Sequence, residues 1–137
     1  MKKDTELWFK YAEENLKSSE VLLNSSLFNP CLQNAQQAVE KFLKALLIEN
    51  SVNLIKTHSI RELVGKLADL GVDTLISEDD TDLLDSIYLP SKYPLLSVLP
   101  LFMPDEDICR HCLNIALHVR AEVVKLLSTP STVLPVA

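Results

Sequence analysis

The sequence predicts an all-α protein, because its composition offers little material for β-strands and its apolar residues recur at helical spacing. Only two of the 137 residues are glycine, which leaves few positions for the tight turns that join strands. The hydrophobic content of 47% is enough for a chain of this length to bury a substantial core. We therefore expect one helical domain over residues 1–128, followed by a tail, residues 129–137, that is flexible or packs on a partner.

The first two predicted helices are long. Residues 4–25 carry an apolar stripe at three- and four-residue intervals, and Asp4 or Thr5 is suited to cap the start. A second helix is expected over residues 29–50, with Asn29 as its cap. Small and apolar side chains share one side of this helix. Its other, polar side carries Gln33, Gln37, Glu40 and Lys44.

The third predicted helix occupies the stretch between residues 57 and 71. Thr57 or Ser59 can cap its start, and the spacing of Ser59 and Glu62 is that of a capping box. Apolar residues then recur at helical intervals. Gly71 follows the last of them and is expected to end the helix, since glycine readily adopts the left-handed conformation found there.

Two further helices are expected, separated by a proline-rich connection. Residues 77–89 form the fourth helix, because acidic residues crowd its first turn and complement the positive end of the helix dipole. The last helix starts at the cap Asp105 and ends near Leu127. The prolines between them predict a long, stiffened loop rather than a continuous helix. They are Pro90, Pro94, Pro100 and Pro104.

Charge and cysteine usage narrow the class of protein. The net charge of −6 and the pI of about 5.0 disfavour a protein that grips nucleic acid by bulk electrostatics. No apolar run is long enough for a membrane span, and the charged N-terminal segment is unlike a signal peptide, so a cytoplasmic protein without membrane contact is expected. Cys31, Cys109 and Cys112 are expected as reduced, buried thiols, and no cofactor or metal site is predicted.

Two segments carry a resemblance to a known family. The run from Gln36 to Leu47 reads QQAVEKFLKALL, and the run from Lys56 to Leu63 reads KTHSIREL. They resemble the Gln-Ala-x-Glu-Lys-x-x-Lys-Ala helix and the Thr-His helix start of the HEPN domain family (higher eukaryotes and prokaryotes nucleotide-binding). The segments Trp8–Leu23 and Ser91–Pro94 resemble the first helix of that family and its Arg-Tyr-Pro loop. Together these similarities cover roughly residues 5–127.

The resemblance implies a fold and a function. It implies an antiparallel up-and-down bundle of four to five helices, commonly a homodimer, that is often encoded beside a minimal nucleotidyltransferase as its partner. The implied function is a nucleotide-binding or interaction module that acts with such a partner. Many members are instead ribonucleases or toxins of toxin–antitoxin pairs, so an enzyme that acts on RNA is the alternative.

In the family that these segments resemble, ribonucleases usually carry an arginine followed by a histidine after four to six intervening residues. The nearest pair here is Arg110 and His118, with seven residues between them. On a straight helix their attachment points lie about 12 Å apart along the axis and about 80° apart in rotation. A metal-independent ribonuclease would therefore need a composite site at a dimer interface. Arg110 would stabilise the phosphorane charge, and His118 with His111 would move the proton.

Lys41 and Lys44 are candidate nucleotide-binding residues on the second helix. Each can meet a phosphate as a mobile point charge. Glu40 stands four residues before Lys44, which is the spacing of a solvent-exposed helix pair. We favour this solvated pair as the interpretation of Glu40 and Lys44.

Three more candidate nucleotide-binding residues lie outside that helix. His58 lies in the opening turn of the third helix, where backbone N–H groups form a weak anion site. Its imidazole either donates to a phosphate or packs the preceding loop onto the bundle. The structural role is favoured for a lone histidine. Lys92 and Tyr93 lie in the proline-rich connection, where Tyr93 offers a stacking face for a base. The same tyrosine can equally pack the loop onto the bundle.

Overall fold

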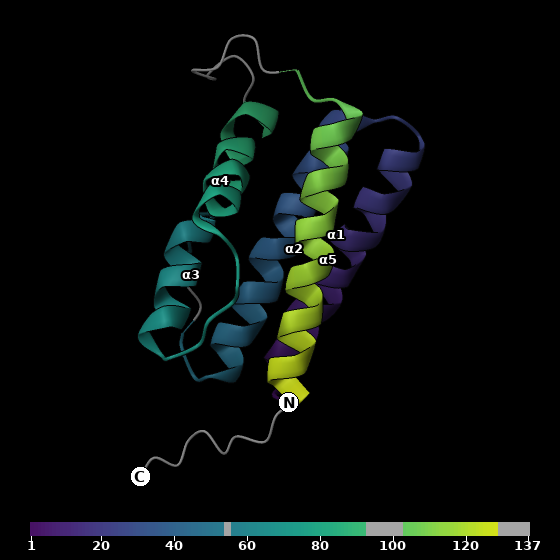
Figure 1. The fold of residues 1–137 in the computed structure, drawn as a ribbon. Helices are drawn as coiled ribbons and strands as arrows, with labels where there is room; N and C mark the ends of the chain where they lie inside the picture. Colours follow the sequence, from purple (N-terminus) through teal and green to yellow (C-terminus); the bar gives the residue numbers. More distant parts are fainter. Residues whose placement is uncertain (54–55, 93–102, 129–137) are drawn as a thin grey trace.

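A computed structural model describes residues 1–53, 56–92 and 103–128 of the chain, with residues 89–92 described by their backbone alone. The described residues form five α-helices and no β-strand (Figure 1), so the all-α prediction is confirmed. The helices are α1 (Lys3–Asn24), α2 (Phe28–Glu49), α3 (Ile60–Asp69), α4 (Glu78–Lys92) and α5 (Glu106–Ser128).

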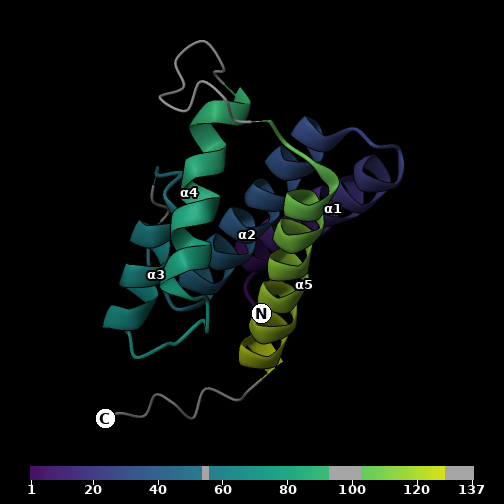
Figure 2. The same cartoon turned by 45° about the horizontal axis from the view of Figure 1, so that its top comes forward.

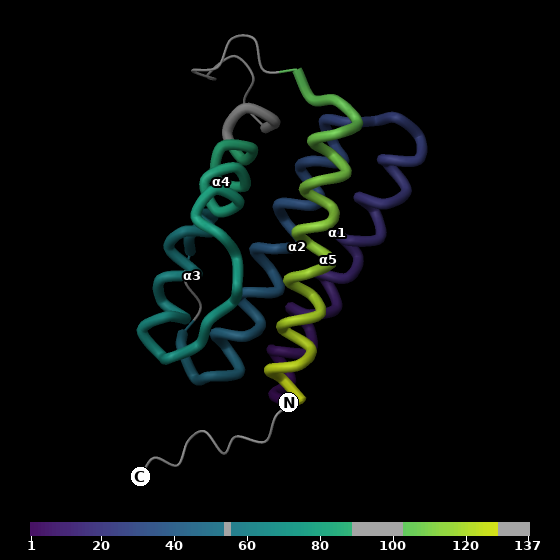
Figure 3. Tube along the Cα trace, viewed as in Figure 1, coloured from purple at the N-terminus to yellow at the C-terminus, as the bar shows by residue number. Residues whose placement is uncertain are grey.

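Helix α2 is the centre of the bundle and contacts each of the other four helices. Helix α1 lies on one side of α2, while α3 and α4 lie on the other side and contact each other (Figures 1 and 2). Helix α5 crosses in front and contacts α1 and α2. The Cα trace shows α1 and α2 running antiparallel, with α5 opposite in direction to α1 (Figure 3). The predicted antiparallel bundle is thus confirmed.

The central position of α2 follows from its sequence. Thirteen of its 22 residues are buried, which is more than a helix with one covered face provides. Phe42 is fully buried and meets Phe9 of α1 edge to face, with 5.1 Å between ring centroids. Small residues of α2 let α1 and α5 approach closely. These are Cys31, Ala35, Ala38 and Ala45, all with no exposed surface.

The start and end of α3 form as predicted. The Ser59 hydroxyl accepts the backbone N–H of Glu62 at 3.1 Å, so Ser59 is the N-cap. At the other end, Gly71 has a φ of 80°, its N–H bonds to the carbonyl of Ala68, and the N–H of Val72 bonds to that of Leu67. This pair of bonds is the Schellman arrangement, in which the left-handed residue is usually glycine.

The cap of α5 forms as predicted, and α4 begins in the same way with a serine that was not predicted as its cap. The Ser77 hydroxyl accepts the N–H of Asp80 at 3.0 Å, and the Asp105 carboxylate accepts the N–H of Ile108 at 2.9 Å. Each side chain satisfies a backbone donor that the helix itself leaves without a partner. Local sequence signals therefore set these two starts.

The predicted caps of α1 and α2 are wrong. The N-cap residues are Lys2 and Leu27, and neither side chain makes a capping hydrogen bond. Asp4 lies inside the first turn of α1, whereas Thr5 is fully buried against the core. Asn29 lies inside α2, because that helix begins earlier, at Phe28.

Helix α4 is longer than predicted. It continues past Leu89 and through Pro90 to Lys92. A proline this close to the end of a helix removes one backbone hydrogen bond and leaves the preceding turns intact, so it need not stop the helix. The predicted loop at 93–102 and the predicted tail at 129–137 lie outside the described residues. None of the described helices combines the length and the apolar character that a membrane crossing needs.

Candidate functional site

The side chain of Glu40 lies at the centre of a buried polar cluster on α2. Its carboxylate accepts a hydrogen bond from the Lys44 ammonium at 3.0 Å, and the Nδ1 atom of His58 lies 3.1 Å from its other oxygen. Glu40 is 2% exposed and Lys44 is 6% exposed. The prediction that these two residues form a solvated pair is therefore wrong, because Trp8 of α1 and His58 cover this part of the polar side of α2.

His58 joins three parts of the bundle. Its ring stacks on Tyr88 of α4, with 4.7 Å between centroids and 13° between planes. Its backbone carbonyl accepts a hydrogen bond from the Gln36 amide of α2 at 3.3 Å. The side chain is still 54% exposed, so one part of the imidazole remains open to solvent. The structural role expected for His58 is present, and the exposed part of the ring leaves room for a ligand contact.

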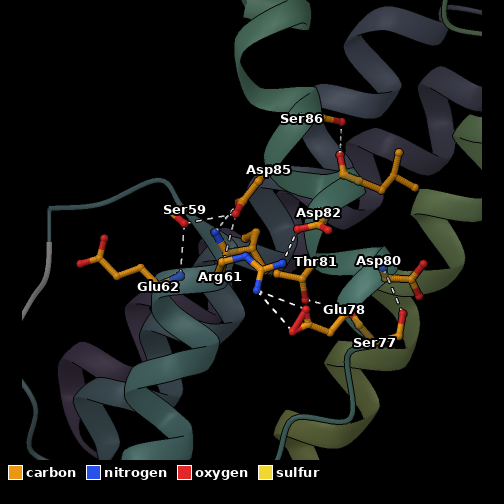
Figure 4. Close-up of polar contacts among 12 residues, drawn as sticks. Ser59, Arg61, Glu62, Ser77, Glu78, Asp80, Thr81, Asp82, Asp85 and Ser86 are labelled. Carbon is orange, nitrogen blue, oxygen red and sulfur yellow. Dashed lines mark hydrogen bonds and ion pairs between the residues drawn. The ribbon is translucent and has the colours of Figure 1, made fainter.

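The N-terminus of α3 already has an anionic partner within the protein (Figure 4). The carboxylate of Asp85, on α4, accepts the backbone N–H groups of Ile60 at 2.6 Å and Arg61 at 3.2 Å, together with the hydroxyl of Ser59 at 3.2 Å. These donors are the ones that we expected to form an anion site beside His58. A phosphate at this position would have to displace Asp85.

Arg61 also joins the start of α3 to α4, through its own positive charge. Its guanidinium forms ion pairs with Glu78 and Asp82 of α4 (Figure 4), and these carboxylates raise the pKa of Arg61 above its ordinary range. The acidic first turn of α4 was predicted only as a complement to the helix dipole. Its carboxylates also bind α3 to α4, which local sequence reasoning did not detect.

The structure separates the other predicted nucleotide-binding residues. The Lys41 ammonium donates to the Asn15 side-chain oxygen of α1 at 2.8 Å, away from the Glu40 cluster. The Lys44 ammonium lies 5.5 Å from the centre of the Trp8 ring, within the range of a cation–π contact. The side chains of Lys92 and Tyr93 lie outside the described residues. Lys44 and His58 thus meet at Glu40, and Lys41 does not join them.

A groove of about 210 Å³ lies between α5 and the connection that precedes α4. Its polar lining consists of Asp80, His111, Asn114 and His118. The Nε2 atom of His111 lies 2.9 Å from the Asp80 carboxylate. A carboxylate in this position fixes the orientation of the imidazole. Two histidines of the predicted catalytic set therefore share one recess, together with an aspartate that sequence reasoning missed.

Arg110 does not line this groove. Its guanidinium pairs with Glu106 one turn earlier on α5 at 2.7 Å, and its side chain is 58% exposed. Within one protomer, Arg110 and His118 are thus not brought to a common recess. An exposed pair of this kind is weak and easily exchanged for another anion.

The cysteines are buried and form no disulfide. Burial is the main cause that raises the pKa of Cys109 to about 12, and the neighbouring thiol of Cys31 adds to the shift. Burial also raises the pKa of Cys112 to about 12. Thiols held neutral in this way are poor nucleophiles and poor metal ligands. Across residues 1–53, 56–92 and 103–128, no three His, Cys, Asp or Glu side chains are grouped in a way that could hold a metal ion.

Fold and site together define a class of protein. It is a helical bundle whose central helix buries the Glu40–Lys44 pair, and Glu40 contacts His58, which precedes the next helix. The sequence profile of the HEPN domain matches residues 5–127. The chain therefore belongs to the HEPN domain family, and the predicted family is confirmed.

Solved structures agree with this assignment. The crystal structure of TT1696 from Thermus thermophilus is 27% identical and superimposes with a TM-score of 0.72, covering 88% of this chain and 96% of that one. The crystal structure of ST0689, an archaeal HEPN homologue, is 24% identical with a TM-score of 0.69, covering 93% and 100% of the two chains, and shows a shared fold. No curated protein is significantly similar to the chain.

Proposed function

We propose that this protein is a homodimeric HEPN module that binds nucleotides and acts with a nucleotidyltransferase partner. The observation that carries the proposal is the outward face of α5. Leu117 is 42% exposed and Val124 is 36% exposed, seven residues apart, with exposed Ala121 between them. This is the three- and four-residue spacing by which two helices pack along a common seam.

A two-fold axis through this face is compatible with the rest of α5. The small side chain of Ala121 allows close approach of a second α5, and the apolar neighbours supply burial. Asn114, one turn before Leu117, continues the stripe with a polar side chain. A single polar residue in such a seam fixes register and partner number.

Sedimentation of the full chain tests the dimer. The wild type is expected as a dimer at micromolar concentration, and Leu117→Glu is expected as a monomer because it places charges in the seam. Leu70→Glu is the matched control, since Leu70 is 47% exposed at the end of α3, remote from this face. A wild-type monomer, or a Leu117→Glu dimer, would refute the homodimer.

Nucleotide binding is supported by two separate positions, Lys41, which contacts Asn15 of α1, and the exposed part of the His58 ring, which stacks on Tyr88 of α4. Lys41 bonds to a neutral amide in the described structure, so its charge remains available to a phosphate. Lys44 is less available, because its charge is matched by Glu40. Lys92 and Tyr93 complete the proposed set.

Calorimetric titration with ATP is the test of nucleotide binding. We expect saturable binding that weakens in Lys41→Ala and not in Lys17→Ala, an exposed lysine of α1. If ATP gives no saturable heat, nucleotide binding is refuted; if both variants bind like the wild type, Lys41 is removed from the site.

Co-purification from the native host tests the nucleotidyltransferase partner. Absence of a nucleotidyltransferase from the recovered complex would refute the proposed partner.

One observation favours a second function, a metal-independent ribonuclease of the toxin type. Arg110 and His118 lie symmetrically about Asn114, four residues before and four after it. This function needs a different arrangement from the Ala121-centred dimer: in an antiparallel pair of α5 helices centred on Asn114, Arg110 of one protomer would face the partner's His118. The composite site that one protomer lacks would then form twice in the dimer.

The chemistry of this second function uses His111 and His118 as base and acid. One imidazole takes the proton of a ribose 2′-hydroxyl, which attacks the adjacent phosphorus, while the other protonates the departing 5′-oxygen. Arg110 stabilises the charge on the phosphorane. Cleavage of an RNA in the presence of EDTA, lost in His118→Ala and retained in Lys17→Ala, is the expected result. Unchanged cleavage by His118→Ala would refute the mechanism.

A further inference from the structure

A second groove, of about 490 Å³, lies between the first turns of α1 and the chain that follows α2. Lys2, Lys3 and Trp8 line it from the α1 side, and Ile48, Ser51 and Asn53 line it from the other side. Its volume is within the range of about 300–1,000 Å³ typical of small-molecule sites. It is separate from the groove beside α5, with which it shares no lining residue.

Two hydrogen bonds hold the walls of this groove in place. The backbone N–H of Lys2 donates to the Glu49 carboxylate at 2.9 Å, and the Lys2 ammonium donates to the Ser51 hydroxyl at 2.8 Å. The first bond joins the start of α1 to the end of α2, and the second spans the groove itself. The site is therefore formed before any ligand arrives, which lowers the entropic cost of binding.

The lining combines an excess of positive charge, from Lys2 and Lys3 against Asp4, with a flat aromatic face. The Lys2 ammonium bonds to a neutral hydroxyl, and the exposed Lys3 forms no ion pair among the residues that the structure describes. Trp8 is partly exposed, and its indole has the electron-rich face on which planar rings stack. Ile48 and Val52 add apolar surface. A fitting ligand is thus a planar ring system that carries an anionic group.

We propose that this groove binds a nucleoside phosphate, with the base stacked on Trp8 and the phosphates at Lys2 and Lys3. Asp4 and Asn53 also line the groove and can hydrogen-bond to the ribose hydroxyls. This inference rests on the proposed nucleotide binding and adds a second binding position, distinct from the one tested with Lys41→Ala, because neither Lys41 nor His58 lines this groove. Lys44 links the two regions, because its ammonium lies against the Trp8 ring.

Trp8 is the sole tryptophan of the chain, so intrinsic tryptophan fluorescence reports on the groove that Trp8 lines and on its contact with Lys44. Titration with ATP is expected to quench the fluorescence saturably. Lys2→Ala/Lys3→Ala is expected to weaken binding tenfold or more, as is the use of adenosine in place of ATP. Lys10→Ala/Lys17→Ala is the matched control, because it removes two exposed lysines of α1 outside the groove and should bind as the wild type does.

Parallel calorimetry separates failure of this site from failure of nucleotide binding. Calorimetric binding of ATP without a fluorescence change, and with full affinity in Lys2→Ala/Lys3→Ala, would overturn the site and leave the proposed function standing. Absence of calorimetric binding would overturn both. Equal affinities for adenosine and ATP would overturn the assignment of the phosphates to the two lysines. Circular dichroism of each variant confirms that the bundle is intact.

Discussion

The carboxylate of Asp85, on α4, accepts the backbone N–H of Ile60, the first residue of α3, at 2.6 Å. It also accepts the next backbone N–H, that of Arg61, and the hydroxyl of the N-cap Ser59. One aspartate thus caps a helix to which it does not belong. The start of α3 depends on its neighbour as well as on its own sequence.

Removal of this carboxylate is expected to destabilise the bundle. Asp85→Ala leaves the first N–H groups of α3 without their partner, and loss of a capping side chain costs about 0.5–2 kcal/mol. Urea denaturation followed by circular dichroism measures the change. Asp79→Ala removes an exposed carboxylate of the same helix and should cost clearly less. Equal losses in the two variants would contradict the capping role.

Glu40→Ala is expected to cost more than any other single replacement of a charged residue discussed above. It leaves the ammonium of Lys44 buried without its counter-ion, a situation that typically costs about 3–5 kcal/mol. Replacing both members, as Glu40→Leu/Lys44→Leu, should recover much of that loss, since no buried charge then remains. Chemical denaturation of both variants gives the comparison.

Glu106→Ala is the control for the buried pair. It breaks the exposed pair with Arg110, and exposed pairs contribute about 0–1 kcal/mol. A loss in Glu40→Ala no larger than that in Glu106→Ala would show that the Glu40 cluster does not stabilise the fold.

The buried thiols give a prediction for alkaline conditions. Because folding raises the pKa of Cys109 and Cys112 from 9.0 to about 12, their contribution to stability is fully present below pH 9 and is lost as the pH rises toward 12. The buried thiols of the native protein should therefore react slowly with a thiol reagent at pH 8. In denatured protein all three cysteines should react rapidly. Rapid labelling of native Cys109 or Cys112 would contradict this account.

Glu49 gives the opposite dependence at acid pH. The hydrogen bond from the Lys2 backbone N–H lowers the pKa of Glu49 below its ordinary value of 4.5. Its contribution to stability is therefore present above pH 4.5 and is lost as the pH falls through the lowered pKa. We expect the wild type to be more stable than Glu49→Gln at neutral pH and the difference to shrink in acid. A difference that is constant with pH would exclude the ionised carboxylate as its source.

Local signals in the sequence were sufficient for much of the helix layout. Ser59 and Asp105 cap the helices that they were predicted to cap, and Gly71 terminates α3 through its positive φ. Each of these features depends on residues within a few positions along the chain. Short-range hydrogen bonding therefore accounts for this success.

The features that the sequence did not reveal depend on contacts between distant segments. Helical periodicity placed Glu40 and Lys44 on a polar face, yet Trp8 and His58, from other parts of the chain, cover them. Asp80 was interpreted as a complement to a helix dipole, although it also orients His111 across the groove. A hydrophobic pattern shows which face of a helix is polar, and it cannot show which polar residues a neighbour will cover.

The three-residue link between α1 and α2 also bears on the order in which the bundle assembles. The link, residues 25–27, brings two helices of 22 residues each together with little loss of loop entropy, whereas α5 must close on α2 over a much longer stretch of chain. We therefore expect the α1–α2 hairpin to form first during folding and α5 to dock last. Pulsed hydrogen exchange should then protect the amides of Phe42 and Leu43 before those of Ala116 and Val119. The reverse order would place the folding nucleus at α5.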